Sequence, residues 1–179
     1  MKTRVKYLVM ILGLLILAEC KKEDNRISIS GITETNPNAE LIGNVDQTDW
    51  RIDDKWTEKE ENLFQEVKSL TAQSYIKGVV PIVADTFKFS PAYPNPFKTT
   101  LTLTIVNNLT SGNLKIVFVN SDFKILKSGN LDLKVGTNIF SVDLADNSIF
   151  EPNNLYRIYY KIYMNNSEVR GHGDIKKIE

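Results

Sequence analysis

The sequence has little of the residue types on which most catalytic and metal sites depend. Its 179 residues include one cysteine and one histidine. A single cysteine excludes an intramolecular disulfide, and a single histidine leaves no spare ligand or base for a His-based metal site or a Ser–His pair. We therefore expect no enzyme activity, no metal and no cofactor. His172, between two glycines, is expected on a turn or an edge strand.

The sequence also lacks an excess of positive charge. Its 22 Lys and Arg residues equal its 22 Asp and Glu residues. A nucleic-acid-binding protein needs clustered cations to neutralise phosphates, so nucleic acid is not an expected ligand.

No hydrophobic run is long enough to cross a membrane, which takes about 20 residues. The longest uncharged run near the start, Tyr7–Ala18, follows the cations Lys2, Arg4 and Lys6. This order of a basic stretch and a short apolar stretch is typical of a secretory signal. Residues 1–19 are predicted to be a signal peptide.

The only cysteine stands where this signal ends. The residues Leu17-Ala18-Glu19-Cys20 resemble the lipobox of bacterial lipoproteins, although Glu19 occupies a position where that family has a small residue. The resemblance implies that Cys20 is acylated and becomes the mature N-terminus. Two or more acyl chains hold a protein stably on a bilayer, so a membrane is an expected partner.

The residues after Cys20 are charged and polar. Lys21, Lys22, Glu23 and Asp24 resemble the short signal that directs Bacteroidetes lipoproteins to the outer face of the outer membrane. The resemblance implies an outer-membrane, surface-facing protein, with the periplasmic face as the alternative. Residues 20–44 are predicted to be an acylated, flexible tether, with a coil-like reach of roughly 25–30 Å.

A helix is predicted over residues 58–72, within the tryptophan-containing segment 45–78. Thr57 and Glu60 have the spacing of a capping box, in which each side chain binds a free backbone N–H group of the other residue. The apolar residues that follow recur at helical spacing. These residues are Leu63, Phe64, Val67 and Leu70.

Both tryptophans, Trp50 and Trp56, precede this helix. We expect them to pack with it over an edge or end of the β domain. The alternative is an exposed surface that binds a protein partner or a glycan, because tryptophan is enriched at binding hot spots. Four aspartates in the same region lack the spacing of a calcium loop and are expected on a solvated face. They are Asp46, Asp49, Asp53 and Asp54.

Residues 85–179 are predicted to form an antiparallel, immunoglobulin-like β-sandwich of about seven strands. The run Thr99–Ile105 alternates threonine with apolar residues, which places Leu101, Leu103 and Ile105 on one face of a strand. Tyr156–Tyr163 has the same period of two. Turn residues separate such runs at nearly regular intervals, including near Gly129.

Two motifs in this region carry a resemblance. The run Tyr93-Pro94-Asn95-Pro96-Phe97 and the run Val135–Leu144, with Gly136 and Asn138, resemble the C-terminal sorting domain of type IX secretion cargo from Bacteroidetes. The resemblance covers about Phe87 to Glu179 and implies a β-sandwich. It departs from the family in the loop over residues 148–154.

The favoured hypothesis is a non-catalytic outer-membrane lipoprotein whose sandwich is an accessory or adaptor. Its expected partner is a membrane protein complex of secretion, motility or uptake. One alternative is type IX secretion cargo whose C-terminal half is a sorting domain. A second alternative is a surface carbohydrate-binding module, so a glycan stays an open ligand class.

Overall fold

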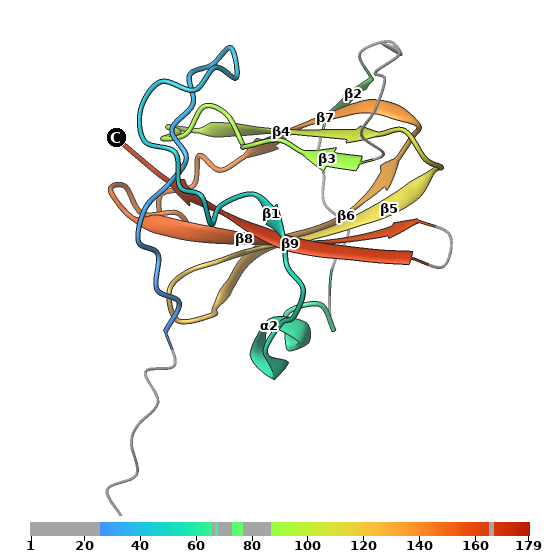
Figure 1. The fold of residues 1–179 in the computed structure, drawn as a ribbon. Coiled ribbons are helices and arrows are strands. Elements are labelled where there is room, and N and C mark those ends of the chain that lie inside the picture. The colour runs from blue at the N-terminus through green and yellow to red at the C-terminus, as the bar shows by residue number, and fades with distance from the viewer. Residues whose placement is uncertain (1–25, 66, 68–72, 77–86, 165–166) are drawn as a thin grey trace, which may run out of the picture.

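The computed structural model describes residues 26–65, 67, 73–76, 87–164 and 167–179. The predicted signal peptide, Cys20 and residues 21–24 lie outside this part of the chain. The described chain forms two antiparallel sheets that face each other, as the predicted β-sandwich requires (Figure 1).

The larger sheet has five strands in the order β1-β9-β8-β5-β6. They are β1 (Arg51–Ile52), β5 (Gly112–Val119), β6 (Ile125–Leu133), β8 (Leu155–Met164) and β9 (Ser167–Lys176). The smaller sheet has four strands in the order β2-β7-β4-β3. They are β2 (Gln73–Ile76), β3 (Phe87–Phe89), β4 (Thr100–Asn107) and β7 (Gly136–Asp143).

The core lies between the sheets and follows the alternation of the sequence. On β4, Leu101, Leu103 and Ile105 are fully buried, while the threonines between them are partly exposed. The predicted inward face of β8 is confirmed in the same way. Its members Tyr156, Ile158, Tyr160 and Ile162 all belong to the core cluster between the sheets. A period of two thus places one face of each strand inside and the other outside.

Residues 85–179 supply the seven strands β3 to β9, and the preceding segment adds one strand to each sheet. β1 pairs with β9 through Arg51 and Ile52, and β2 pairs with β7. The turn expected near Gly129 is wrong. β6 runs through this residue, and Gly129 pairs with Ile116 inside the ladder.

The predicted helix is present only in its first part. α2 (Glu58–Asn62) begins with the expected capping box of Thr57 and Glu60, and Leu63 is its C-cap. The extent to residue 72 is wrong, because the described helix stops at Asn62 and Leu63 and Phe64 then bury their side chains against the larger sheet. Residues 66 and 68–72 lie outside the described part.

The prediction of a flexible tether over residues 20–44 is wrong for residues 26–36, whose buried members pack on the sandwich, whereas residues 37–44 are exposed. Ile27, Ile32, Thr33 and Thr35 are buried. Thr35 forms isolated β-bridges with both Leu41 and Asn95. The composition of the segment suggested coil. The backbone hydrogen bonds between Thr35 and the distant Asn95 nevertheless hold it on the sandwich.

A core substitution tests this arrangement. Leu103→Ala deletes a fully buried side chain between the sheets, and we expect it to lower the free energy of unfolding by about 2–5 kcal/mol. Leu109→Ala is the control, because Leu109 is 47% exposed, and its expected change is within about 0.5 kcal/mol. Urea denaturation followed by circular dichroism measures both; equal losses would contradict the assignment of Leu103 to the core.

Candidate functional site

The family-motif residues form a structural junction around Asn95. The peptide bonds before Pro94 and Pro96 are both cis. The amide nitrogen of the buried Asn95 side chain donates to the carbonyls of Thr33 and Asp174, at 3.0 Å each. Its amide oxygen accepts from the backbone N–H of Lys176 at 3.0 Å. One side chain therefore ties the N-terminal segment to β9.

The residues beside Asn95 strengthen the same junction. Thr35 exchanges two backbone hydrogen bonds with Asn95, and the Thr35 hydroxyl donates to the carbonyl of Ala92 at 2.7 Å. Phe97 is fully buried, and its backbone bonds with Lys176 and Ile178. Tyr93 is half-buried and pairs with Thr102 of β4. The proline-rich motif thus joins three parts of the chain.

The second motif, Gly136 and Asn138, shapes the turn into β7. Gly136 has a φ of 107°, a conformation that favours glycine. The Asn138 side chain accepts from the N–H of Lys134 at 2.9 Å and donates to the carbonyl of the same residue at 2.8 Å. Both residues have roles inside the fold.

A buried charge cluster lies next to the Asn95 junction. Arg157 makes a bidentate salt bridge to Asp174, with two N···O distances of 2.7 Å. The Asp49 carboxylate accepts backbone N–H bonds from Thr33 and Asp174. Burial, and then the charge of Asp174, raise the pKa of Asp49 to about 6. The solvated face expected for the aspartates is therefore wrong for Asp49, which is buried.

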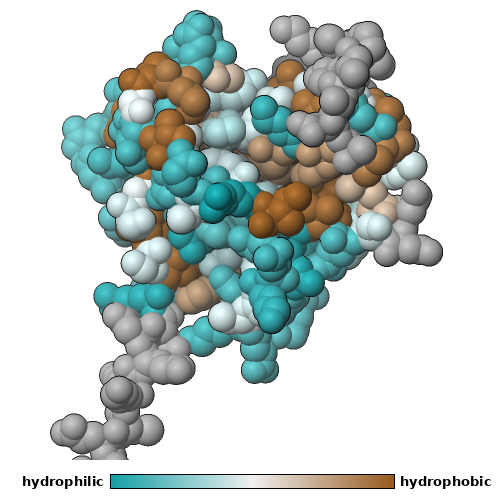
Figure 2. All heavy atoms as spheres, viewed as in Figure 1, coloured by the Kyte–Doolittle hydropathy of each residue, from teal (hydrophilic) through white to brown (hydrophobic). Residues whose placement is uncertain are grey.

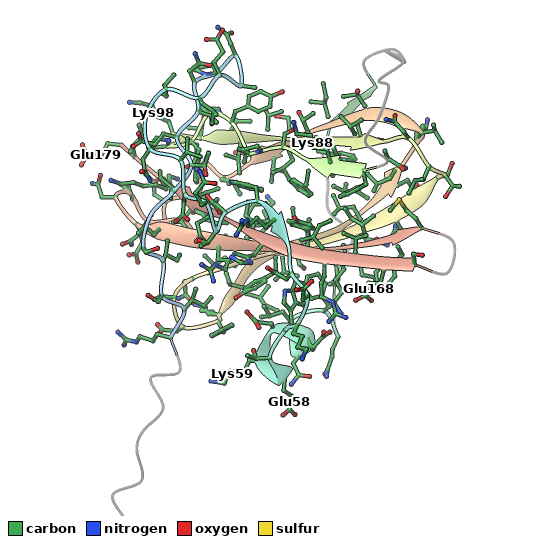
Figure 3. All side chains as sticks on the ribbon, viewed as in Figure 1. Glu58, Lys59, Lys88, Lys98, Glu168 and Glu179 are labelled. Atoms are coloured by element: carbon green, nitrogen blue, oxygen red, sulfur yellow. The ribbon has the colours of Figure 1, made fainter. Side chains whose placement is uncertain are left out.

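The outer face of the larger sheet carries a cover made of Asp53, Trp56 and α2, which we call the α2 cover. Trp56 stacks on Phe64 and meets the edge of Tyr159, with ring centroids 5.4 Å apart in each case. The Tyr159 hydroxyl donates to Glu60 at 2.9 Å. The Lys161 ammonium pairs with Glu61 and lies over the Trp56 ring, 5.3 Å from its centroid. Figure 3 shows Glu58 pointing away from the sandwich. The Lys59 ammonium lies over the ring of Phe123 in the β5–β6 turn, 5.7 Å from its centroid.

The histidine belongs to this cover. His172 Nδ1 lies 2.8 Å from an Asp53 carboxylate oxygen, and the Trp56 indole donates to the same oxygen at 2.7 Å. Burial opposes these bonds, but together they hold the pKa of Asp53 below its ordinary value. The turn or edge strand expected for His172 is wrong, because it lies on β9, which pairs with β1 on one side and β8 on the other at this residue.

The tryptophans pack on the β domain, in the way expected, and each has a different position. Trp50 is only 8% exposed and stacks on Phe89 at the edge of the core between the sheets. Gly173 makes room for this ring, because a Cβ there would lie 2.4 Å from the indole. Trp56 is half-buried in the α2 cover. Because Trp50 is buried in this way, its ring has no exposed face for a glycan or a protein partner.

One end of the sandwich holds a hollow of about 350 Å³. One side of the hollow is formed by the β5–β6 turn and the start of β6, and the other side by the β7–β8 loop and the start of β8. We call this surface the open end. Three large apolar side chains line it and are exposed: Ile125 (42%), Ile149 (41%) and Leu155 (37%). Sequence reasoning missed this surface, because its members are 30 residues apart and only the topology brings them together.

The start of the described chain lies beside the open end. Arg26 forms an exposed salt bridge with Asp122 in the β5–β6 turn, with an N···O distance of 3.0 Å. The N–H of Ile27 donates to the carbonyl of Ser121 at 2.7 Å. Figure 1 shows this contact at the lower left of the molecule.

The open end is a candidate for a binding surface. Exposed apolar side chains around a hollow are typical of contact sites. Across the described residues, no group of three or more His, Cys, Asp or Glu side chains could hold a metal ion. Helices in the same part of the chain are too short or too polar to cross a membrane.

Comparisons with known proteins give no family assignment. No model of a known protein family matches the chain, and none of the curated proteins matches it significantly. The function must therefore be argued from the geometry and from the sequence motifs.

The Asn95 junction can be tested by truncating its amide. Asn95→Ala leaves the Thr33 and Asp174 carbonyls and the Lys176 N–H without this partner. Each unsatisfied buried group costs about 1–3 kcal/mol, so we expect a loss of at least about 3 kcal/mol in the free energy of unfolding. Asn130→Ala, on an exposed position of β6, should change it little. A stable Asn95→Ala variant in urea denaturation would refute the role of the junction.

The buried Asp49 predicts a pH dependence of stability. Its folded pKa of about 6 lies above its ordinary value of 3.8, so the folded state holds a proton that the unfolded state releases. Stability should fall as pH rises from 4 to 6, by up to about 3 kcal/mol, and then level off. Asp49→Asn removes this titration, so the difference in unfolding free energy between variant and native protein should change with pH in that window. A constant difference would contradict the raised pKa.

Proposed function

We propose that the chain is a non-catalytic lipoprotein of an outer membrane, whose β-sandwich is an accessory module that binds a membrane protein. The observation that carries this proposal is the position of the only cysteine. Cys20 ends the signal-like segment and stands six residues before Arg26, where the packed N-terminal segment begins. Acylation at this position would hold the sandwich close to a bilayer.

The chemistry of the described residues supports a binding role over a catalytic one. The single histidine has its Nδ1 engaged by Asp53 in the α2 cover. The buried charges of Asp49, Arg157 and Asp174 satisfy one another and the backbone at the Asn95 junction. These groups stabilise the fold, which leaves the exposed apolar side chains as the part of the surface suited to contact.

The alternative of a cleavable type IX sorting domain is less favoured. Cleavage near Ser90 would remove β1 and β2, which pair with β9 and β7. It would also remove Thr33 and Thr35, which bond to Asn95. A fragment beginning near Ser90 would keep the motif but lose its contacts with Thr33 and Thr35.

The alternative of carbohydrate binding through tryptophan is also less favoured. A sugar stacks on an open aromatic face. Trp50 is buried against Phe89, and the ring of Trp56 is occupied by Phe64, Tyr159 and Lys161.

Replacing the anchor residue tests the proposal. The native protein should sediment with membranes, and its intact mass should equal that of residues 20–179 plus acyl chains. Cys20→Ser should move the protein to the soluble fraction, because the acyl chains supply the membrane affinity. A native mass that includes an unmodified Met1, or a Cys20→Ser variant that stays with the membrane, would contradict it. Protease accessibility on intact cells then reports which face of the membrane carries the sandwich.

A further inference from the structure

The open end carries three exposed apolar side chains that the proposed function does not yet use. Ile125, Ile149 and Leu155 come from the start of β6, the β7–β8 loop and the start of β8. They surround a hollow of about 350 Å³. Single exposed apolar residues need no explanation, but a group of them rimmed by polar residues indicates a contact surface.

The length of chain before Arg26 limits what this surface can meet. Five residues lie between Cys20 and Arg26, and the six steps from one to the other span at most about 20 Å when fully extended. Arg26 is bound to Asp122 at the open end itself. An anchor at Cys20 would therefore hold the open end within about 20 Å of the bilayer.

The opposite end of the sandwich is further from the anchor. Leu109 and Val135 are also exposed, and they lie in the turns that precede β5 and β7. The eight residues of β5 separate Leu109 from the β5–β6 turn, which is roughly 26 Å along the strand. These two side chains match those of the open end in exposure but not in position.

The α2 cover also faces outward, but its chemistry differs. Its exposed residues include Glu58, which points away from the sandwich in Figure 3, and Lys59. Figure 2 shows hydrophilic residues over the lower part of this face. A charged surface gains nothing from entering the apolar boundary of a bilayer. Of the two surfaces near the start of the described chain, only the open end presents apolar side chains.

We infer that the open end rests on the bilayer, with Ile125, Ile149 and Leu155 inserted at the boundary between headgroups and acyl chains. This inference depends on the proposed acylation of Cys20. The charged side chains around the open end balance in number, with Arg26 and Lys124 against Asp122 and Glu151. Insertion should therefore depend little on salt or on the fraction of anionic lipid.

Fluorescent labels can test this orientation on the full acylated chain. Acylation consumes the Cys20 thiol, so a newly introduced cysteine is the only site for a thiol-reactive probe. The three variants are Ile149→Cys at the open end, Val135→Cys at the opposite end and Glu58→Cys on α2. Each is labelled with an environment-sensitive fluorophore and reconstituted in neutral phosphatidylcholine vesicles with or without lipids that carry a quencher at a shallow acyl position.

The label at position 149 should lose most of its fluorescence to the quencher lipids, and the labels at positions 135 and 58 should keep theirs. The labelled Ile149→Cys variant is then made again with both Ile125→Ser and Leu155→Ser. These two changes should restore much of the lost signal, which separates apolar insertion from mere closeness. Equal quenching at all three positions, or quenching strongest at position 58, would overturn the orientation.

Two further outcomes separate this inference from the proposed function. Intact mass comes first: a chain without acyl groups overturns both proposals. An acylated chain whose position 149 is not quenched by lipid overturns the orientation alone. If position 149 is instead shielded from a water-soluble quencher only in native membranes, a partner protein covers the open end and the lipid assignment is wrong.

Discussion

The fold depends on the side-chain amide of Asn95. This group is buried, and its nitrogen donates to the carbonyls of Thr33 and Asp174 while its oxygen accepts from the N–H of Lys176. A buried amide is costly unless its hydrogen bonds are made. The proline-rich segment, β9 and the N-terminal segment must therefore come together as one unit. The Asp49, Arg157 and Asp174 cluster next to it adds charge-assisted bonds between the same parts.

Residues before the seven-stranded region cover two parts of the sandwich, the edge of its core and the outer face of the larger sheet. Trp50 closes the edge of the core against Phe89, and the α2 cover buries Tyr159 and Lys161 on the outer face of the larger sheet. The same stretch supplies β1 and β2. What composition suggested to be a linker and an appended helix is thus part of a single packed domain. In this arrangement, only a short linker, residues 21–25, would separate an anchor at Cys20 from the packed chain.

Much of the fold could be predicted from the sequence, because the alternation of apolar and polar residues in a β-strand shows which side chains face the core. The alternation in β4 and β8 identifies the inward side chains directly, and the Thr57–Glu60 capping box marks the start of α2. The N-terminal segment could not be predicted, because its order comes from bonds to residues about 60 or more positions away, such as Thr33 with Asn95. The burial of Asp49 and the grouping of Ile125 with Ile149 have the same cause. Each depends on which loops meet, and no local pattern encodes that.

The position of β9 has a consequence for how the chain reaches its folded state. β9 is an interior strand of the larger sheet, yet it comes last among the strands in sequence. Its Asp174 N–H donates to the carboxylate of Asp49, which also accepts from the N–H of Thr33. Contacts over such sequence distances slow folding, because the entropy of closing a long loop is lost before the contact forms and stabilises the chain. Ile27 packs in a cluster with Val117, Val119 and Tyr159. While the chain emerges from the ribosome, the surface that buries Ile27 is therefore incomplete until residues near 159 are made, and the partners of Asp49 and Asn95 on β9 follow later still.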